Sequence, residues 1–252
     1  CSIAYGSKRI LEGIGVWDLM APEAEPILEI RVTDQGAPLF LHYDHHEVGD
    51  HPLGWIVENR VTRTALLEAA AACPMLHHLA PISVLEFKPD GERIEAGLAD
   101  GRRVLARLGV AADGRRSRLR EAAGIRTVEW SYDQAGIVCT VRHERPHRGI
   151  AQERFLSAGP FAILPMSEDR ASIVWTEQTD HAAHLMGLAE GEFLAELEAR
   201  FGDYLGGLEV AGPRWSYPLA LTHSNRYTAT RLALAGDAAH AMSPQLGQGS
   251  NL

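Results

Sequence analysis

The sequence predicts a mixed α/β chain in which α/β segments are interleaved with a mainly antiparallel sheet. Two observations predict the α/β part: short apolar runs end in an acidic residue beside a glycine, once at Asp113-Gly114 and once at Gly236-Asp237. A third observation predicts the sheet, because several segments between residues 130 and 220 carry apolar residues in alternation. This period of two is typical of strands that bury one face.

Each expected element follows from a local pattern. Apolar residues at helical spacing or Ala- and Leu-rich runs predict helices at 2–20, 60–73, 118–123 and 190–201. Alternating or continuous apolar runs, bounded by Gly, Pro and Asp turns, predict strands at 27–33, 38–42, 81–88, 93–99, 102–105, 136–143, 151–156, 161–165, 172–177, 215–221 and 232–235.

Composition narrows the functional class. The hydrophobic fraction is 46% and the charged fraction is 23%, which suits a globular chain with a buried core. A run of about 18 or more apolar residues, as a membrane-spanning helix needs, does not occur. The net charge of −9 argues against a nucleic-acid surface. The three cysteines fit no CxxC pattern and are typical of a reducing compartment.

The last residues of the chain, LALAGDAAHAMSPQLGQGSNL, combine the features that a flavin site needs. Asp237 follows an apolar strand, and a carboxylate at a strand end can accept hydrogen bonds from a ribose hydroxyl. The glycines at 247 and 249 let main-chain N–H groups approach a planar ring closely. A helix that begins there directs its positive end at negative charge on that ring.

This segment resembles the second FAD fingerprint of the flavoprotein aromatic hydroxylases, and most closely that of their ubiquinone-biosynthesis branch. The family carries GDAAH, a proline and GQGxN, which stand here as residues 236–240, Pro244 and residues 247–251. The resemblance implies FAD contacts from Gly236, Asp237, Pro244, Gly247, Gln248, Gly249 and Asn251.

A second segment, VAADGRRSRLR at residues 110–120, looks like the family's ADGxxSxxR motif. The resemblance implies that Asp113 and Gly114 lie near the FAD pyrophosphate, and that the arginine-rich turn assists NAD(P)H. Arg115 and Arg118 are permanent cations suited to phosphate oxygens, and we include Arg118 among the cofactor-binding residues. Taken alone, an Asp-Gly pair followed by basic residues is more often a solvated turn.

A third match is Arg60, in WIVENRVTRTALL, at the place where the family has an arginine that contacts FAD. The alternative is that Arg60 pairs with Glu58, and the sequence does not decide between them. Residues 143–147 (HERPH) and 159–165 (GPFAILP) also resemble the ubiquinone branch. We assign them no chemistry, and no catalytic acid or base is placed.

The family's architecture implies a partial FAD-binding domain at 1–25, 58–125 and 226–252, and a substrate-binding sheet domain at 27–57 and 130–220. Because the family opens with a βαβ unit carrying GxGxxG and no GxGxxG occurs here, we expect an internal fragment that lacks this unit and a C-terminal part, so that both domains are incomplete.

The resemblance implies an FAD-dependent monooxygenase that uses NAD(P)H and O₂, through a flavin C4a-hydroperoxide, to hydroxylate a polyprenylated phenol of ubiquinone synthesis. It also implies a cytoplasmic protein that contacts the inner membrane peripherally and joins a ubiquinone-synthesis complex, without a nucleic-acid partner. Two alternatives are a related FAD-dependent reductase or halogenase, against which the HERPH and GPFAILP segments count, and a non-catalytic fragment that does not bind FAD.

One further segment, residues 42–51, packs four histidines and three carboxylates into ten positions. Imidazoles and carboxylates suit zinc, iron or manganese. Strand alternation would, however, place His45 and His46 on opposite faces. We therefore expect a solvated loop and no metal site.

Overall fold

The computed structural model describes residues 1–35, 37, 39–242 and 251, and its contacts divide the chain into two units. The first unit comprises 1–72, 132–219 and 251, and the second comprises 73–131 and the described part of 220–250. Residues 1–25, which the resemblance assigns to the cofactor domain, thus lie in the unit of the large sheet. The division into a cofactor domain and a substrate domain stays a prediction.

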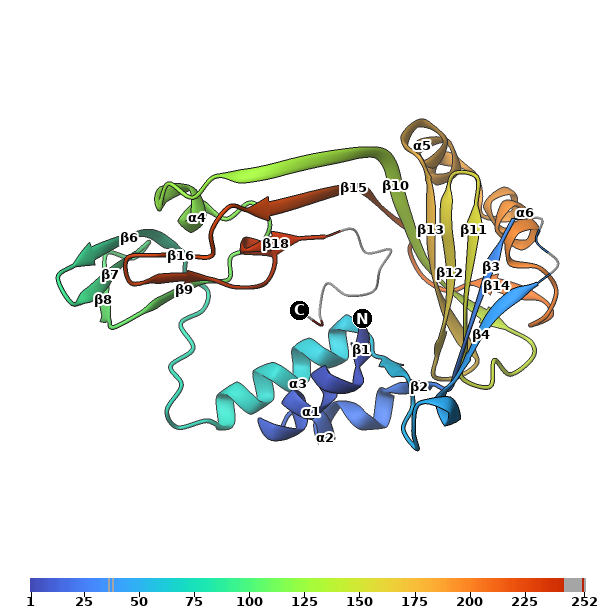
Figure 1. The fold of residues 1–252 in the computed structure, drawn as a ribbon, viewed down its shortest axis with the longest axis horizontal. Coiled ribbons are helices and arrows are strands. Elements are labelled where there is room, and N and C mark those ends of the chain that lie inside the picture. The colour runs from blue at the N-terminus through green and yellow to red at the C-terminus, as the bar shows by residue number, and fades with distance from the viewer. Residues whose placement is uncertain (36, 38, 243–250, 252) are drawn as a thin grey trace. The chain divides into compact units, whose positions relative to one another are not determined.

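Figure 1 shows the helices and strands along the chain. The helices are α1 (Tyr5–Gly13), α2 (Trp17–Met20), α3 (Asn59–Ala72), α4 (Arg118–Ala122), α5 (Thr179–Gly187) and α6 (Glu190–Phe201), with 3₁₀ turns η1 (Ala21–Glu23), η2 (His45–Glu47) and η3 (Gly236–Ala238). The strands are β1 (Ser2–Ala4), β2 (Glu25–Ile27), β3 (Glu29–Asp34), β4 (Phe40–Asp44), β5 (Gly54–Ile56), β6 (Val84–Asp90), β7 (Arg93–Leu98), β8 (Arg103–Ala106), β9 (Gly109–Ala111), β10 (Thr127–His143), β11 (Ile150–Leu156), β12 (Gly159–Met166), β13 (Arg170–Gln178), β14 (Leu208–Val210), β15 (Trp215–Ser224), β16 (Thr228–Ala229), β17 (Leu232–Leu234) and β18 (His240–Ala241).

The alternating residues between 130 and 220 form one large sheet in the first unit. Its strand order is β18-β15-β10-β13-β12-β11-β3-β4, where the short β18 belongs to the second unit, and β14 pairs with the far end of β10. From β10 to β4, neighbouring strands of this sheet are antiparallel, except that β11 and β3 run parallel. The predicted mixed α/β fold with a mainly antiparallel sheet is confirmed.

The core of the first unit lies between this sheet and the helices α5 and α6, which cover one face (Figure 1). Trp175 on β13 is paired with Ile137 on β10 and Phe161 on β12, and all three are at most 1% exposed. Phe193 of α6 approaches Trp175 with a ring-centroid distance of 5.9 Å. Every second residue of the central strands points to this face. The alternating apolar residues of the sequence therefore form a continuous buried layer.

The expectation of one helix over residues 2–20 is wrong. Residues 2–4 instead form β1, which pairs with β5 in a small sheet β1-β5-β2. The helix that follows ends before Gly15, whose φ of +71° breaks the helical path. Ile10 and Ile14, which carried the helical pattern, are 67% and 60% exposed, so their spacing does not mark a buried face.

The second unit contains two further sheets, β16-β17-β9 and β6-β7-β8. Strands β9 and β17 run parallel, and their buried side chains share one apolar cluster with Leu119 of α4. This small parallel pair positions the two acidic-glycine turns, which are the turn at Asp113-Gly114 and the turn at Gly236-Asp237.

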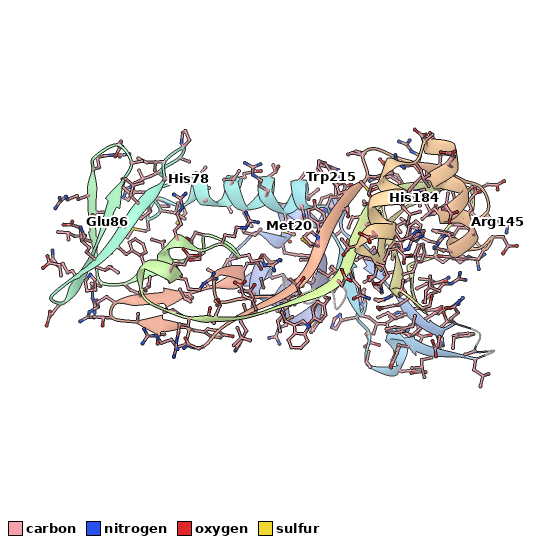
Figure 2. All side chains as sticks on the ribbon, turned by 90° about the horizontal axis from the view of Figure 1, so that it is seen from above. Met20, His78, Glu86, Arg145, His184 and Trp215 are labelled. Carbon is pink, nitrogen blue, oxygen red and sulfur yellow. The ribbon has the colours of Figure 1, made fainter. Side chains whose placement is uncertain are left out.

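The HERPH segment, residues 143–147, has a structural role that the sequence did not suggest. His147 Nδ1 accepts a hydrogen bond from the Gly149 N–H at 3.0 Å, so its Nε2 carries the proton and donates to Met166 O at 2.8 Å. Arg145, labelled in Figure 2, donates to a main-chain carbonyl in the loop after α6 at 3.3 Å. The segment therefore ties the β10–β11 connection to the end of β12 and to the loop after α6.

His143 makes the stability of this region dependent on pH. Its Nδ1 donates to Arg145 O at 2.9 Å, and its Nε2 is buried without a partner among the described residues. Burial lowers the pKa of His143 below 6.5, aided by the nearby His147 ring and opposed by the hydrogen bond to Arg145 O, by the Arg170 main chain and by Asp169. In the unfolded chain the imidazole takes up a proton at a higher pH than in the folded chain, so acid favours unfolding.

We expect the free energy of unfolding to fall as pH drops from about 7 to about 5, and to fall less steeply in His143→Gln. Urea unfolding of both proteins at a series of pH values measures the two slopes. Equal slopes would show that His143 is not buried in its neutral form.

Candidate functional site

The parallel pairing of β9 and β17 brings two of the predicted motifs together. Leu232 pairs with Gly109 and Leu234 with Ala111, and the Ala235 N–H continues the ladder to Ala111 O at 2.9 Å. Because the strands are parallel, the turns that follow them leave the same edge of the sheet. One turn carries Asp113-Gly114 and the other carries Gly236-Asp237. The carboxyl ends of parallel strands are where α/β sheets bind ligands.

Hydrogen bonds from α4 shape the first turn. Ser117 is fully buried and donates its hydroxyl to Asp113 Oδ1 at 2.5 Å, while the Leu119 N–H donates to Asp113 Oδ2 at 3.3 Å. The Ser117 oxygen in turn accepts the Arg120 N–H at 3.0 Å and caps the helix. Gly114 has a φ of +83°, with no atom within 4 Å of the place where a Cβ would stand. Asp113 is thereby held in place beside an unobstructed stretch of backbone.

The second turn has similar features. Gly236 has a φ of +55°, again with open space where a Cβ would stand. It begins the 3₁₀ turn η3, in which Asp237 is exposed and Ala238 is buried. A buried alanine next to an exposed carboxylate anchors the turn and leaves the carboxylate accessible.

Arg120 joins the two turns, and sequence reasoning missed it. Its side chain is only 3% exposed, and it donates from Nη1 to Ala238 O at 3.1 Å and from Nη2 to Arg115 O at 3.0 Å. The predicted residue, Arg118, is exposed on the same helix. The motif ADGxxSxxR itself places its arginine three residues after Ser117, at Arg120. That spacing is the signal that could have identified Arg120. A contact of Arg118 with the cofactor stays a prediction.

Two other predicted residues belong to the first unit. Arg60 forms ion pairs with Glu58 at 3.1 Å and with Glu23 at 2.5 Å, and its side chain is 61% exposed. The ion pair with Glu58 that the sequence left open is therefore present. Asn251 accepts the Ala4 N–H at 2.9 Å and donates to Ser2 O at 3.1 Å, so its amide is bonded to β1. Cofactor contacts of both residues stay predictions.

The remaining predicted residues are outside the part of the chain that the structure describes. They are Pro244, Gly247, Gln248 and Gly249.

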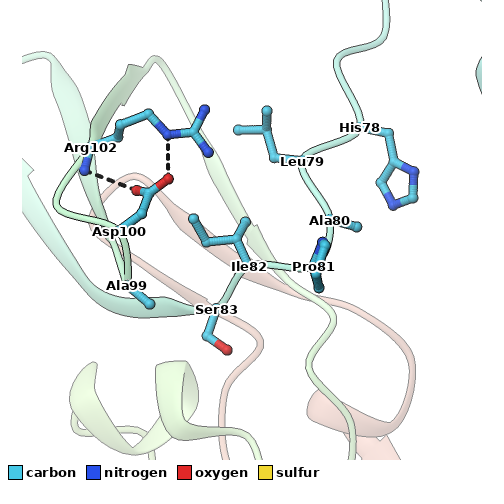
Figure 3. A pocket seen from close by; sticks show the side chains of 9 residues that line it. All are labelled: His78, Leu79, Ala80, Pro81, Ile82, Ser83, Ala99, Asp100 and Arg102. Carbon is cyan, nitrogen blue, oxygen red and sulfur yellow. Dashed lines mark hydrogen bonds and ion pairs between the residues drawn. The ribbon is translucent and has the colours of Figure 1, made fainter.

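An open pocket of about 810 Å³ lies elsewhere in the second unit (Figure 3). It is lined by residues 78–83 and by Ala99, Asp100 and Arg102. Asp100 accepts hydrogen bonds from the main-chain N–H and the Nε of Arg102, at 3.0 and 2.6 Å, so both charges are already paired. None of the predicted site residues that the structure describes lines this pocket.

Comparison with known proteins decides the family. The family model described as FAD binding domain matches residues 2–252. The chain belongs to the FAD binding domain family. FAD is the cofactor of this family, and the resemblance to the ubiquinone-biosynthesis branch of FAD-dependent hydroxylases is confirmed.

Relatives of this FAD binding domain chain include ubiquinone hydroxylases. Ubiquinone hydroxylase UbiL of Rhodospirillum rubrum is 52% identical over 252 residues, which cover 100% of this chain and 58% of the relative. The 3-demethoxyubiquinol 3-hydroxylase of Escherichia coli is 32% identical over 254 residues, covering 100% of this chain and 64% of the relative. The chain thus spans less than two thirds of the length of these curated relatives.

Solved structures show the same fold. PqsL of P. aeruginosa, in complex with 2-aminobenzoylacetate, has a TM-score of 0.84 and 23% identity, covering 100% of this chain and 71% of that one. The p-nitrophenol 4-monooxygenase PnpA of Pseudomonas putida has a TM-score of 0.76 and 19% identity, covering 99% of this chain and 66% of that one. Among the described residues of this FAD binding domain chain, no helix is both long and apolar enough to cross a membrane.

Proposed function

We propose that this chain supplies FAD-binding turns to a flavin-dependent aromatic hydroxylase whose substrate is a polyprenylated phenol of ubiquinone synthesis. One observation carries the proposal: the parallel pair β9–β17 presents Asp113-Gly114 and Gly236-Asp237 at the same sheet edge. The names of the relatives, ubiquinone hydroxylase and 3-demethoxyubiquinol 3-hydroxylase, support the substrate class.

The residues at this edge fit a dinucleotide. Both glycines have positive φ and open space on the side where other residues carry a Cβ, so main-chain atoms there are accessible to a ligand. Asp237 is an exposed carboxylate, which can accept hydrogen bonds from ribityl or ribose hydroxyls. Asp113 acts as a positioning residue, because its two oxygens are occupied by Ser117 and Leu119. Arg115, whose Nε donates to Thr222 at 3.1 Å, keeps its other nitrogens for a phosphate oxygen.

When bound, FAD supplies the redox chemistry, taking hydride from NAD(P)H and activating O₂ for transfer of one oxygen atom to an aromatic ring. The chain's own residues bind and orient the cofactor, and the large sheet of the first unit would contact the substrate. A polyprenylated substrate dissolves in a bilayer, so we further propose a cytoplasmic protein that contacts the inner membrane peripherally and associates with other ubiquinone-synthesis enzymes.

Binding of FAD tests the proposal directly. Flavin fluorescence is titrated with this chain, and with the same chain carrying a βαβ unit with GxGxxG fused to its N-terminus. In whichever protein binds FAD, Asp237→Ala should weaken binding about tenfold, since one hydrogen-bonded charged contact is worth about 1.5 kcal/mol or more. Asp90→Ala, which removes an exposed carboxylate of β6 in the same unit, is the matched control and should bind FAD like the parent.

Three outcomes separate the alternatives. FAD binding with hydroxylation of prenylated phenols supports the proposal. Binding with NAD(P)H oxidation but no oxygen transfer favours a reductase or, if halide is consumed, a halogenase. Absence of FAD binding in both proteins, or an equal loss in Asp90→Ala and Asp237→Ala, contradicts the site.

A further inference from the structure

The β3–β4 hairpin gathers imidazole and carboxylate groups that the proposed FAD site does not use. The antiparallel register sets Glu29 opposite Asp44 and Arg31 opposite His42, so these four side chains share one face of the hairpin. His42 Nε2 lies 3.0 Å from Glu29 Oε2. One ligand atom each from Glu29, His42 and Asp44 lie within 4.8 Å of one another.

The turn after β4 adds two more imidazoles. β4 ends at Asp44, and η2 begins there with Asp44 Oδ1 accepting the His46 N–H at 2.9 Å. The rings of His45 and His46 lie together, with centroids 3.9 Å apart. The expectation that they occupy opposite faces is therefore wrong, because a 3₁₀ turn, and not a strand, contains them. Asp44, His45 and His46 form a second group whose ligand atoms lie within 4.8 Å of one another.

We propose that Glu29, His42 and Asp44, with a fourth ligand from the His45–His46 pair, bind one divalent transition metal ion of the zinc type. Mixed imidazole and carboxylate ligands suit zinc and its neighbours, whereas magnesium and calcium prefer oxygen alone. Ligand atoms about 2.1 Å from zinc stand about 3.4 Å apart in a tetrahedron. The atoms of Glu29, His42 and Asp44 lie within 4.8 Å of one another and reach this spacing by side-chain rotation, and rotation of the His45 or His46 ring supplies the fourth ligand.

The surroundings of the hairpin prepare these groups for a cation. The main-chain N–H of His46 donates to Asp44 Oδ1 at 2.9 Å and so fixes the direction of this carboxylate. His45 Nδ1 lies 3.1 Å from Leu28 O and 3.2 Å from Asp44 Oδ1, so this ring is held against both the main chain and a proposed ligand.

Arg31 provides the sharpest test, because it competes with a metal ion. Its Nη2 donates to the same Glu29 Oε2 at 2.8 Å, while its guanidinium lies 5.9 Å from the Phe40 ring. A metal ion must displace this positive charge from Glu29. Arg31→Gln should therefore tighten metal binding, whereas removal of a ligand should weaken it.

The experiment is calorimetric titration of the purified chain with Zn²⁺, together with absorption spectra after addition of Co²⁺. One saturable site is expected, and His42→Gln and Asp44→Asn should each weaken zinc binding by about tenfold or more. Arg31→Gln should strengthen it several-fold. His184→Gln is the matched control, because His184 lies on α5 (Figure 2) with its ring 6.0 Å from that of His181, in another histidine pair of the same unit.

Far-UV circular dichroism of each variant establishes that the sheet is intact. Absence of a saturable zinc site overturns the proposal. It is equally overturned by zinc binding that survives both His42→Gln and Asp44→Asn, by loss of binding in His184→Gln, or by Mg²⁺ binding as tightly as Zn²⁺. A weaker zinc site in Arg31→Gln would show that Arg31 supports the cluster and does not compete with the ion.

Discussion

Arg120→Met should lower the free energy of unfolding of the second unit by about 2–4 kcal/mol, because it removes a buried cation and leaves two main-chain carbonyls without their charged donor. These carbonyls belong to Arg115 and Ala238, one in each of the two turns. Since the guanidinium bonds to both turns, FAD affinity should also fall by at least about tenfold. Urea unfolding and flavin fluorescence measure the two effects.

Arg118→Met is the matched control, because it removes an exposed arginine from the same short helix. It should change stability by no more than about 0.5 kcal/mol. If it weakens FAD binding without a change in stability, the predicted contact of Arg118 with the cofactor is supported. Equal stability of the two variants would show that Arg120 does not hold the turns together.

Trp175→Ala should destabilise the first unit by about 3–5 kcal/mol, the usual cost of removing a large aromatic side chain from a closed core. Trp175 is 1% exposed and contacts Phe161, Phe193 and the guanidinium of Arg200, which lies 4.4 Å from its ring. The loss of these contacts opens a cavity beneath α6 that its neighbours fill only in part. Near-UV circular dichroism during urea unfolding measures the effect.

Two variants sharpen this test. Trp175→Phe should lower the free energy of unfolding much less than Trp175→Ala. The buried indole N–H has no hydrogen-bond partner among the described residues, so its removal breaks no hydrogen bond. Trp215→Ala removes a tryptophan that is 54% exposed in the same unit, and it should have a small effect. Similar losses for Trp175→Ala and Trp215→Ala would contradict the position of the core.

The sequence by itself determined the strands whose pattern is local. The alternation in residues 130–220 predicted the large sheet, since burial of one face imposes a period of two whatever the partner strand is. The two acidic-glycine turns were also recognisable, because a sharp change of direction after a short strand requires particular residues at fixed spacing. Both predictions concern a few neighbouring residues.

Tertiary structure alone decided which distant segments meet. Residues 2–4 form a strand because β5, about fifty residues later, offers a partner, and helical spacing could not reveal it. Arg120 is buried because its side chain reaches Ala238, 118 positions away. His45 and His46 lie together because the strand before them ends at Asp44. The pattern of neighbouring residues indicates whether a segment prefers a helix or a strand. Strand pairing and burial depend on contacts between segments far apart in the sequence, which the spacing of apolar residues does not reveal.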